Sequence, residues 1–243
     1  MIRLLIILLL FWCSNAFAIT DTFQEGVSGY AGTKDAILQS ASTNQHTTNS
    51  AQMRELSTIP YILYFDISTI PASATVSSAT IQLYVSEQNC TDEIMGVRSI
   101  QNPDNSGSFD ANTAAADVFN DYATWAYKDH GVTTAWKVGG AAGNFTDVYN
   151  NANENTQTSG ACPGYVLKTW TVTNMVQGWV TTPNSNGGMV FSTADVGRVD
   201  IRSRFYVTST ERPLLTVNYT SVIKNVSITG GNIKITDGNL RLF

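Results

Sequence analysis

Side chains that commonly carry catalysis are scarce in this sequence. Its 243 residues include only two histidines, His46 and His130, and charged residues make up 14% of the chain. The Gly-x-Ser-x-Gly turn of many serine hydrolases is missing, as are the phosphate-binding glycine loops and the His-Glu-x-x-His zinc motif. The adjacent carboxylates Asp92 and Glu93 are an arrangement that arises by chance in many proteins. These absences predict that the protein is not an enzyme.

Positive charge and long apolar runs are scarce as well. The chain has 14 lysines and arginines against 19 aspartates and glutamates, a net charge of −5. Nucleic-acid binding requires a basic surface, so we expect no nucleic-acid partner. After the first eighteen residues no segment approaches the length of apolar chain that crosses a bilayer as a helix. The sequence therefore predicts no membrane span.

The first eighteen residues have the three parts of a signal peptide. Arg3 provides the positive start, residues 4–12 are apolar, and Ala16-Phe17-Ala18 matches a small-x-small cleavage site. We therefore expect cleavage after Ala18 and a secreted protein, located outside the cell or in the periplasm. A lipoprotein signal with Cys13 as the lipidated residue is an alternative, although the bulky Trp12 lies where such signals have a small residue.

Only two cysteines would remain after this cleavage, Cys90 and Cys162. An even pair of cysteines in an exported protein is typical of a disulfide bond. This disulfide would close a loop of about 70 residues and stabilise the fold by roughly 4 kcal/mol if chain entropy alone is counted. Two free thiols or a metal site are alternatives, but a zinc site of two cysteines would need histidines nearby.

Apolar residues recur with the period of a strand rather than that of a helix. Residues 79–85 alternate between apolar and polar, and residues 62–67 are apolar apart from Asp66, as in a strand buried on both faces. Residues 174–181 are the one segment with a helical pattern. Further strands are expected at 169–172, 189–192, 201–208 and 214–219. Short strands separated by turns predict an all-β fold, a jelly-roll β-sandwich.

Two stretches with a different composition interrupt this pattern. Residues 102–123 and 140–164 are rich in Asn, Asp, Ala, Gly and Thr. We interpret them as long surface loops, where binding surfaces often lie. The predicted disulfide would restrain the second loop through Cys162.

The C-terminal tail repeats a seven-residue unit, at 228–234 and again at 235–241. Each unit places a Gly-Asn turn between alternating apolar residues, which predicts a small meander of short strands. Such strands are marginal alone and need a sheet to join, which another copy of the chain could supply by self-association. We therefore divide the chain into a signal peptide at 1–18, a sandwich domain at 19–221 and a β-repeat tail at 222–243.

Several short motifs follow one another in a specific order along the chain. They are Asp21-Thr22-Phe23, Tyr30-Ala31-Gly32-Thr33, Phe65-Asp66-Ile67-Ser68-Thr69-Ile70-Pro71, Ala79-Thr80-Ile81-Gln82-Leu83-Tyr84, Ala123-Thr124-Trp125, Val176-Gln177-Gly178-Trp179 and Arg212-Pro213-Leu214-Leu215-Thr216-Val217. In this order and spacing they resemble the DNRLRE-domain family, which is also classed among the carbohydrate-binding modules. Gly29 stands where the family usually has Asn, and the long loops, the cysteine pair and the tail lie outside the family pattern.

This resemblance implies a jelly-roll sandwich with a non-catalytic accessory or surface role. Members of the family occur beside polysaccharide lyases and in cell-surface and adhesive proteins, and binding of acidic polysaccharide such as alginate is claimed for some of them. The tryptophans that match family motifs are expected to serve mostly in packing; the four candidates are Trp125, Trp136, Trp170 and Trp179. A secreted carbohydrate-binding or adhesive module is thus one hypothesis. A structural cell-surface or matrix protein that assembles through its tail is the other.

A basic and aromatic ribbon is the sharpest local signal for a ligand. The candidate ligand-binding residues are Arg198, Arg202, Arg204, Tyr206 and Tyr84. On the strand expected at 201–208, the second, third and fourth of these alternate onto one face. A guanidinium group can hold a carboxylate or sulfate at two points, so such a ribbon would suit an acidic polysaccharide or cell-surface glycan. The alternative is an ordinary solvated face whose arginines pair with acids such as Asp195 and Asp200.

Metal binding is a weaker expectation. Jelly-roll modules often hold a structural calcium ion through carboxylates and carbonyl oxygens. Asp21 and Asp35, near the start of the domain, are the candidate ligands, and a domain without metal is an equally open reading. No other cofactor is expected.

Overall fold

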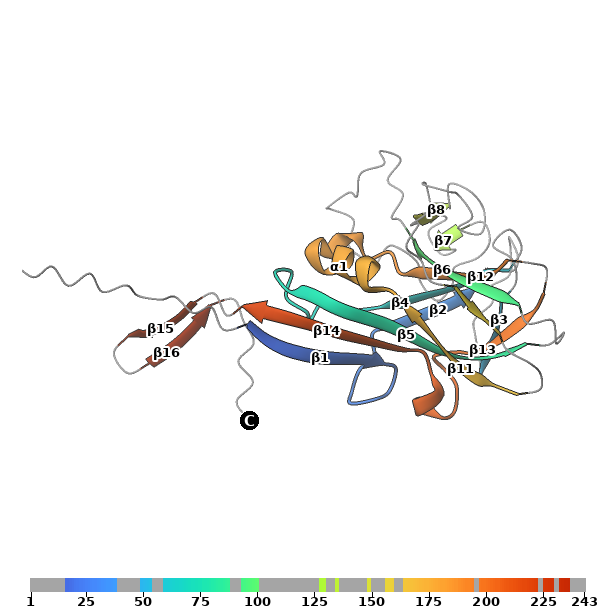
Figure 1. The fold of residues 1–243 in the computed structure, drawn as a ribbon, viewed down its shortest axis with the longest axis horizontal. Helices are drawn as coiled ribbons and strands as arrows, with labels where there is room; N and C mark the ends of the chain where they lie inside the picture. Colours follow the sequence, from blue (N-terminus) through green and yellow to red (C-terminus); the bar gives the residue numbers. More distant parts are fainter. Residues whose placement is uncertain are drawn as a thin grey trace, which may run out of the picture.

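The fold is known from a computed structural model of the chain. The residues it describes are 16–38, 49–53, 59–87, 93–100, 127–129, 134–135, 148–149, 156–159, 164–194, 197–222, 225–229 and 232–236. They form two six-stranded antiparallel sheets that face each other as a β-sandwich (Figure 1). This arrangement confirms the predicted all-β sandwich.

Sheet A consists of six strands that come from widely separated parts of the chain. They are β1 (Ala16–Gln24), β14 (Leu214–Val222), β5 (Thr75–Glu87), β11 (Val166–Thr171), β13 (Val199–Arg202) and β3 (Ser50–Met53). β5 is the central strand: β11 pairs with one of its edges, while β14 and β13 share the other. The cleavage expected after Ala18 falls within β1, so a mature strand would begin at Ile19, opposite Tyr219.

Sheet B lies on the other side of the core. Its strands are β2 (Thr33–Ile37), β4 (Tyr61–Phe65), β12 (Met189–Thr193), β6 (Ile94–Ile100), β10 (Thr156–Thr158) and β9 (Val148–Tyr149). Every residue of β4 and β12 is buried, as the apolar stretch at 62–67 predicted for β4, which ends before the exposed Asp66. Two further pairs stand outside these sheets, β7 (Tyr127–Asp129) with β8 (Thr134–Ala135), and β15 (Asn225–Thr229) with β16 (Asn232–Thr236).

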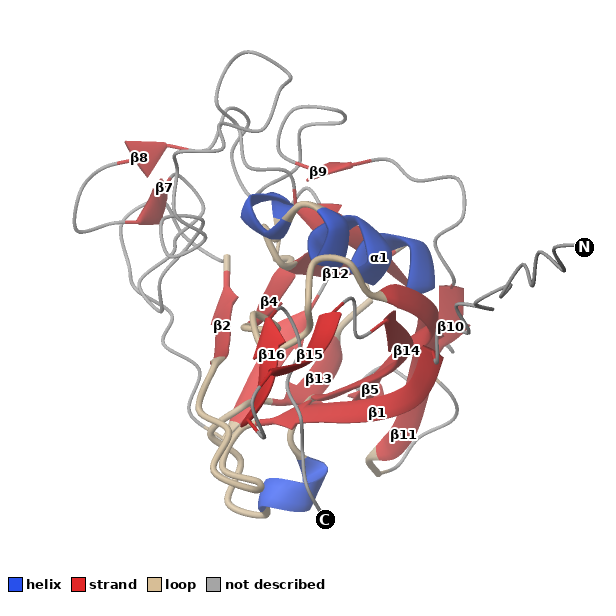
Figure 2. Cartoon of the chain, turned by 90° about the vertical axis from the view of Figure 1, so that its left-hand side faces the viewer, coloured by secondary structure: helices blue, strands red, loops and turns tan. Residues whose placement is uncertain are grey.

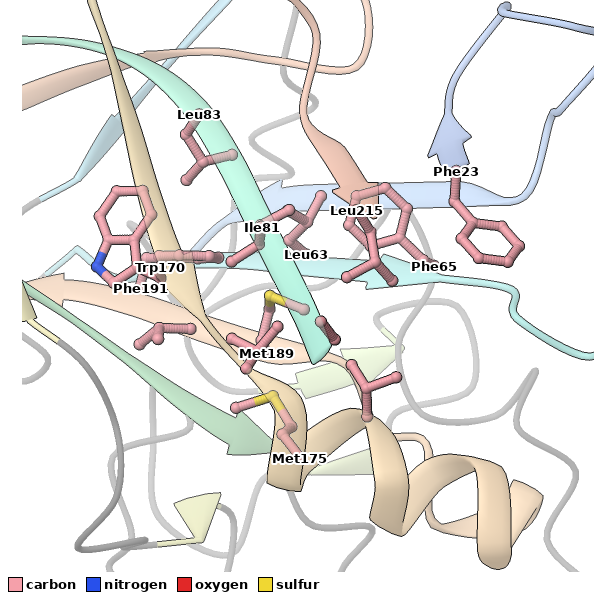
Figure 3. Close-up of a cluster of buried hydrophobic side chains, with 14 of the residues drawn as sticks. Phe23, Leu63, Phe65, Ile81, Leu83, Trp170, Met175, Met189, Phe191 and Leu215 are labelled. Carbon is pink, nitrogen blue, oxygen red and sulfur yellow. The ribbon is translucent and has the colours of Figure 1, made fainter. Parts of the chain in front are cut away.

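The core fills the space between the sheets with aromatic and branched side chains. Trp170 and Phe191 meet edge to face with ring centroids 5.3 Å apart, and both are fully buried (Figure 3). Burying one large apolar side chain stabilises the fold by roughly 1.5–3 kcal/mol, so a cluster of this size provides the main driving force for folding. The alternation of β5 places Ile81 and Leu83 in this core and leaves Gln82 and Tyr84 on the outward face of sheet A.

One helix covers the sandwich. Helix α1 (Thr173–Thr181) follows β11 and buries Met175, Val176, Trp179 and Val180, and Figure 2 shows it above the strands of both sheets. The side chain of Gln177 fastens it to the start of β5 by accepting a hydrogen bond from the Val76 N–H and donating one to the Ala74 carbonyl. The helix confirms the prediction for 174–181. Within the described residues, no helix is long and apolar enough to cross a membrane.

One predicted strand is wrong in its extent. The strand expected at 201–208 ends at Arg202, the last residue of β13. Ser203 turns the chain because its hydroxyl accepts a hydrogen bond from the Phe205 N–H and its carbonyl accepts one from the Tyr206 N–H. A short 3₁₀ turn, η4 (Ser209–Glu211), follows before β14. A second such turn, η3 (Pro183–Ser185), links α1 to β12.

Several sequence predictions fall outside the described residues. These are the signal peptide up to residue 15, both cysteines of the predicted disulfide, and the first long loop at 102–123. In the second predicted loop, at 140–164, the structure describes the two short strands β9 and β10 together with Ser159 and Gly164. In the tail it describes the hairpin β15–β16.

Candidate functional site

Four side chains meet on the outward face of sheet A, and they come from β5, from β13, from the residue just before β11 and from the turn that follows β13. Ile201 of β13 pairs with Val85 of β5, and because the strands are antiparallel, Arg202 after Ile201 comes beside Tyr84 before Val85. Val166, the first residue of β11, pairs with Val85 from the other edge, which places Tyr165 beside the same point. Tyr206 reaches it from the turn that follows β13.

Arg202 is the centre of this group. Its guanidinium carbon lies 4.3 Å from the ring centroid of Tyr206, 4.4 Å from that of Tyr165 and 5.3 Å from that of Tyr84. Glu211 of η4 forms an ion pair with the same guanidinium group. We refer to Tyr84, Tyr165, Arg202, Tyr206 and Glu211 as the tyrosine–arginine cluster.

Partial burial holds the side chains of the tyrosine–arginine cluster in place. The Arg202 side chain is only 16% exposed, and the three tyrosines are half-buried. A cation above an aromatic ring contributes about 0.5–1 kcal/mol at an exposed site and about 2 kcal/mol when desolvated, so three such contacts hold the rings in place. Burial, together with the charge of Asp200, raises the pKa of Tyr165, so its hydroxyl stays protonated and can donate a hydrogen bond.

The other two predicted arginines do not join this cluster. The Arg198 Nε lies 3.0 Å from the Asp200 carboxylate, in a partly exposed ion pair. This is the pairing that the alternative reading of a solvated face anticipated for Asp200, whereas Asp195 lies outside the described residues.

Arg204 points away from the outward face and into the protein. Its Nη1 donates a hydrogen bond to the Thr33 carbonyl at 2.6 Å, and its Nε lies 3.3 Å from the buried Asp35 carboxylate. Tyr61 donates a hydrogen bond to the same carboxylate at 2.9 Å. Burial, followed by the charge of Asp35, raises the pKa of Tyr61 well above its usual value, which keeps this donor protonated. The predicted ribbon of Arg202, Arg204 and Tyr206 is therefore not one surface, because the strand ends before its second member.

The two aspartates considered as calcium ligands lie on different sheets. Asp21 is on β1, where its carboxylate accepts a hydrogen bond from the Tyr219 hydroxyl at 2.9 Å. Asp35 is on β2 and serves as the counterion of Arg204. Among the described residues there is no group of three or more His, Cys, Asp or Glu side chains arranged to hold a metal ion. The structure thus does not bring this pair together as a metal site.

Sequence reasoning missed two members of the cluster, Tyr165 and Glu211. Tyr165 directly follows a segment that was interpreted as a loop, and only the pairing of β11 with β5 brings it beside Arg202. Glu211 belongs to η4, nine residues further along the chain than its partner. The expectation that family-like tryptophans are packing residues is confirmed for Trp170 and Trp179, which are both buried. Trp125 and Trp136 lie outside the described residues.

Comparison with known proteins adds no relative to this description. No family model matches the chain, and no curated protein matches it. The resemblance to the DNRLRE-domain family therefore stays a prediction that rests on the sequence motifs.

Proposed function

We propose that this protein is a secreted, non-catalytic carbohydrate-binding module and that the tyrosine–arginine cluster is its glycan contact. The observation that carries the proposal is the gathering of three half-buried tyrosines around Arg202 on the outward face of sheet A. The apolar face of a sugar ring stacks on an aromatic ring, while a tyrosine hydroxyl remains available to the sugar hydroxyls. The motif resemblance to the DNRLRE-domain family supports the same function.

The contacts around Arg202 favour binding because they fix the rings beforehand. Ordering a flexible side chain on binding costs about 0.5–1.5 kcal/mol, and a ring already held in place avoids this cost. Glu211 holds the guanidinium group from the side of η4, so the central member of the cluster is fixed as well.

The ion pairs of the two arginines also bear on whether the ligand is acidic or neutral. The arginines of the sequence predicted an acidic polysaccharide, because guanidinium groups hold carboxylates and sulfates. Arg202, however, already pairs with Glu211, and Arg198 pairs with Asp200. An acidic sugar would have to displace an internal carboxylate, which reduces the gain from binding.

Affinity electrophoresis in gels that contain soluble polysaccharides, after a glycan array has selected them, tests the proposal. We expect Tyr84→Ala to weaken retention about tenfold, while Tyr84→Phe keeps most of it, because the Phe ring still stacks on the sugar. Ile94→Ala is the matched control, since Ile94 is an exposed apolar residue on sheet B. Equal retention of the Tyr84→Ala and Ile94→Ala variants would refute the role of the cluster.

A structural surface protein is the second candidate, and one feature of the tail favours it. β15 and β16 pair only with each other within the described part of the chain. A two-stranded hairpin is marginally stable in water, and its unpaired edges can join another sheet. If the protein assembles in this way, light scattering should give a mass that is a multiple of the chain mass, and removing the tail should restore the monomer.

A further inference from the structure

The outward face of sheet A extends well beyond the tyrosine–arginine cluster. The alternation of β1, β14, β5 and β11 turns one set of side chains into the core and the other set outward. Four threonines occupy matching outward positions: Thr22 pairs with Thr216, Thr216 with Thr80, and Thr80 with Thr171. We call these four residues the threonine row.

The dimensions of the threonine row follow from strand geometry. Neighbouring strands lie about 4.8 Å apart, so four strands place the outer two threonines about 14 Å from each other. All four side chains are exposed or half-buried. Each contributes a hydroxyl that can both donate and accept a hydrogen bond, beside a methyl group that can contact the C–H face of a sugar.

Most positions on both sides of the threonine row are polar, with Leu214 as an apolar exception opposite Gln82, and several of them are already ordered. On one side Thr20 donates a hydrogen bond to the Asn218 side-chain oxygen at 2.5 Å, and the Asn218 amide donates one to the Ser78 hydroxyl at 2.9 Å. On the other side the Gln82 amide donates one to the Thr169 hydroxyl at 3.2 Å. These bonds fix the side chains while each keeps further hydrogen-bonding capacity for a ligand.

No charged side chain stands at an outward position of β1, β14, β5 or β11 in the structure as described. Beyond Tyr84, the charges on and beside β13 are paired with one another, Arg202 with Glu211 and Arg198 with Asp200. A carboxylate or sulfate placed over the threonine row would lose part of its hydration without meeting a cation, which is unfavourable. An uncharged ligand has no such cost.

We infer that the threonine row and the tyrosine–arginine cluster form one extended surface for the uncharged, hydroxyl-rich chain of a neutral polysaccharide. The inference rests on the proposed function and adds to it the charge class of the ligand and the length of the surface. The polysaccharide stacks one sugar on Tyr84 and runs from there along β5, where it exchanges hydrogen bonds with Gln82 and with the threonine row at Thr80 and its neighbours. Tyr84 lies on β5 two residues beyond Gln82 and four beyond Thr80, so these contacts follow one strand.

The test compares neutral and acidic soluble polysaccharides, namely hydroxyethylcellulose, glucomannan, xyloglucan and alginate, by affinity electrophoresis of the full protein. The double variant Thr80→Val/Thr216→Val removes two hydroxyls and keeps the side-chain shape. We expect it to weaken retention by a neutral polysaccharide about tenfold. Thr80→Ser/Thr216→Ser keeps the hydroxyls and should retain binding. Thr156→Val on β10 is the control, because Thr156 is exposed on sheet B.

The outcomes separate this inference from the proposed function. If Tyr84→Ala abolishes retention and the valine pair leaves it intact, the threonine row is not a binding surface, but the cluster is. Stronger retention by alginate than by every neutral polysaccharide would overturn the inference that the ligand is neutral. If no polysaccharide retains the protein, both proposals fail. A dimer by light scattering that the valine pair dissociates would make this face an interface between two copies of the chain. Circular dichroism and the melting temperature establish that each variant is folded.

Discussion

Asp35 shows how a single residue can join the two sheets of the sandwich. It lies on β2 of sheet B, yet its carboxylate accepts hydrogen bonds from the Tyr61 hydroxyl and from the backbone N–H of Arg204, which follows sheet A strand β13. Its side chain is fully buried, and that of Arg204 is only 12% exposed. A charge in such a place is tolerated only when it is paired, so this pair is best understood as structural.

The first prediction concerns this buried ion pair. We expect Asp35→Ala to lower the free energy of unfolding by about 3–5 kcal/mol, because it leaves the Arg204 charge without its counterion. Asp200→Ala removes a carboxylate from the more exposed pair with Arg198 and should cost only about 0.2–1 kcal/mol. Denaturant unfolding of both variants measures the two losses. Comparable losses would show that the Arg204 pair is not the stabilising contact described here.

Only some residues of the candidate site could be predicted from the sequence, and the reason is physical. Arg202, Tyr206 and Tyr84 stood out in the sequence, and the structure brings them together. Tyr165 and Glu211 did not, because neither a strand register nor the position of a 3₁₀ turn can be read from local composition. Arg204 seemed to belong to the site because Arg202, Arg204 and Tyr206 keep a two-residue spacing beyond the end of β13. Its actual direction is set by Asp35, which is far away in the sequence.

At the scale of elements, the strands with the clearest patterns were the ones predicted. β4 is a buried apolar run and β5 alternates strictly over its core contacts, so each could be recognised from its own residues. The prediction located β12, β11 and the first part of β14 within a few residues. β3 and β6 lack a clear strand pattern in the sequence, because β3 has four residues and β6 includes Gly96, Arg98 and Ser99 among its apolar residues. Their place depends on the sheets that they join.

The second prediction compares two glycines, one with no room for a side chain and one with open space around it. Gly187, between η3 and β12, is buried, and a Cβ there would lie 2.2 Å from the backbone oxygen of Ile100 at the end of β6. Because a backbone atom cannot move aside easily, we expect Gly187→Ala to destabilise the fold by about 1–3 kcal/mol. Gly178 lies within α1 and has nothing within 4 Å of an added Cβ.

Gly178→Ala should therefore stabilise the protein by about 0.5–1 kcal/mol, because alanine loses less conformational entropy than glycine in a helix. Thermal unfolding followed by circular dichroism compares the two variants with the parent. The packing of the η3 turn against β6 would be in error if both alanines shifted the melting temperature in the same direction.

At the scale of the whole molecule, the proposed glycan-binding face and the proposed assembly hairpin belong to separate parts of the chain. Sheet A presents a largely polar face, without charges at the outward positions of β1, β14, β5 and β11, which ends in the tyrosine–arginine cluster. The tail hairpin follows β14 and has no partner strand other than its own among the described residues. Binding and assembly can therefore be tested independently, because β14 finds its partners, β1 and β5, without the tail.

The last prediction follows from this separation. Truncation after Val222 removes the hairpin but keeps all of β14, so the register from Leu214 to Val222 and the hydrogen bonds of sheet A remain. We expect the melting temperature and the retention by polysaccharide to stay the same as in the full chain, since the core and the outward face, as far as the structure describes them, are built from residues up to Val222. Tyr84→Ala, in contrast, should lose retention with the tail in place. A truncated protein that no longer binds polysaccharide, although its melting temperature is unchanged, would move the glycan contact from sheet A to the tail.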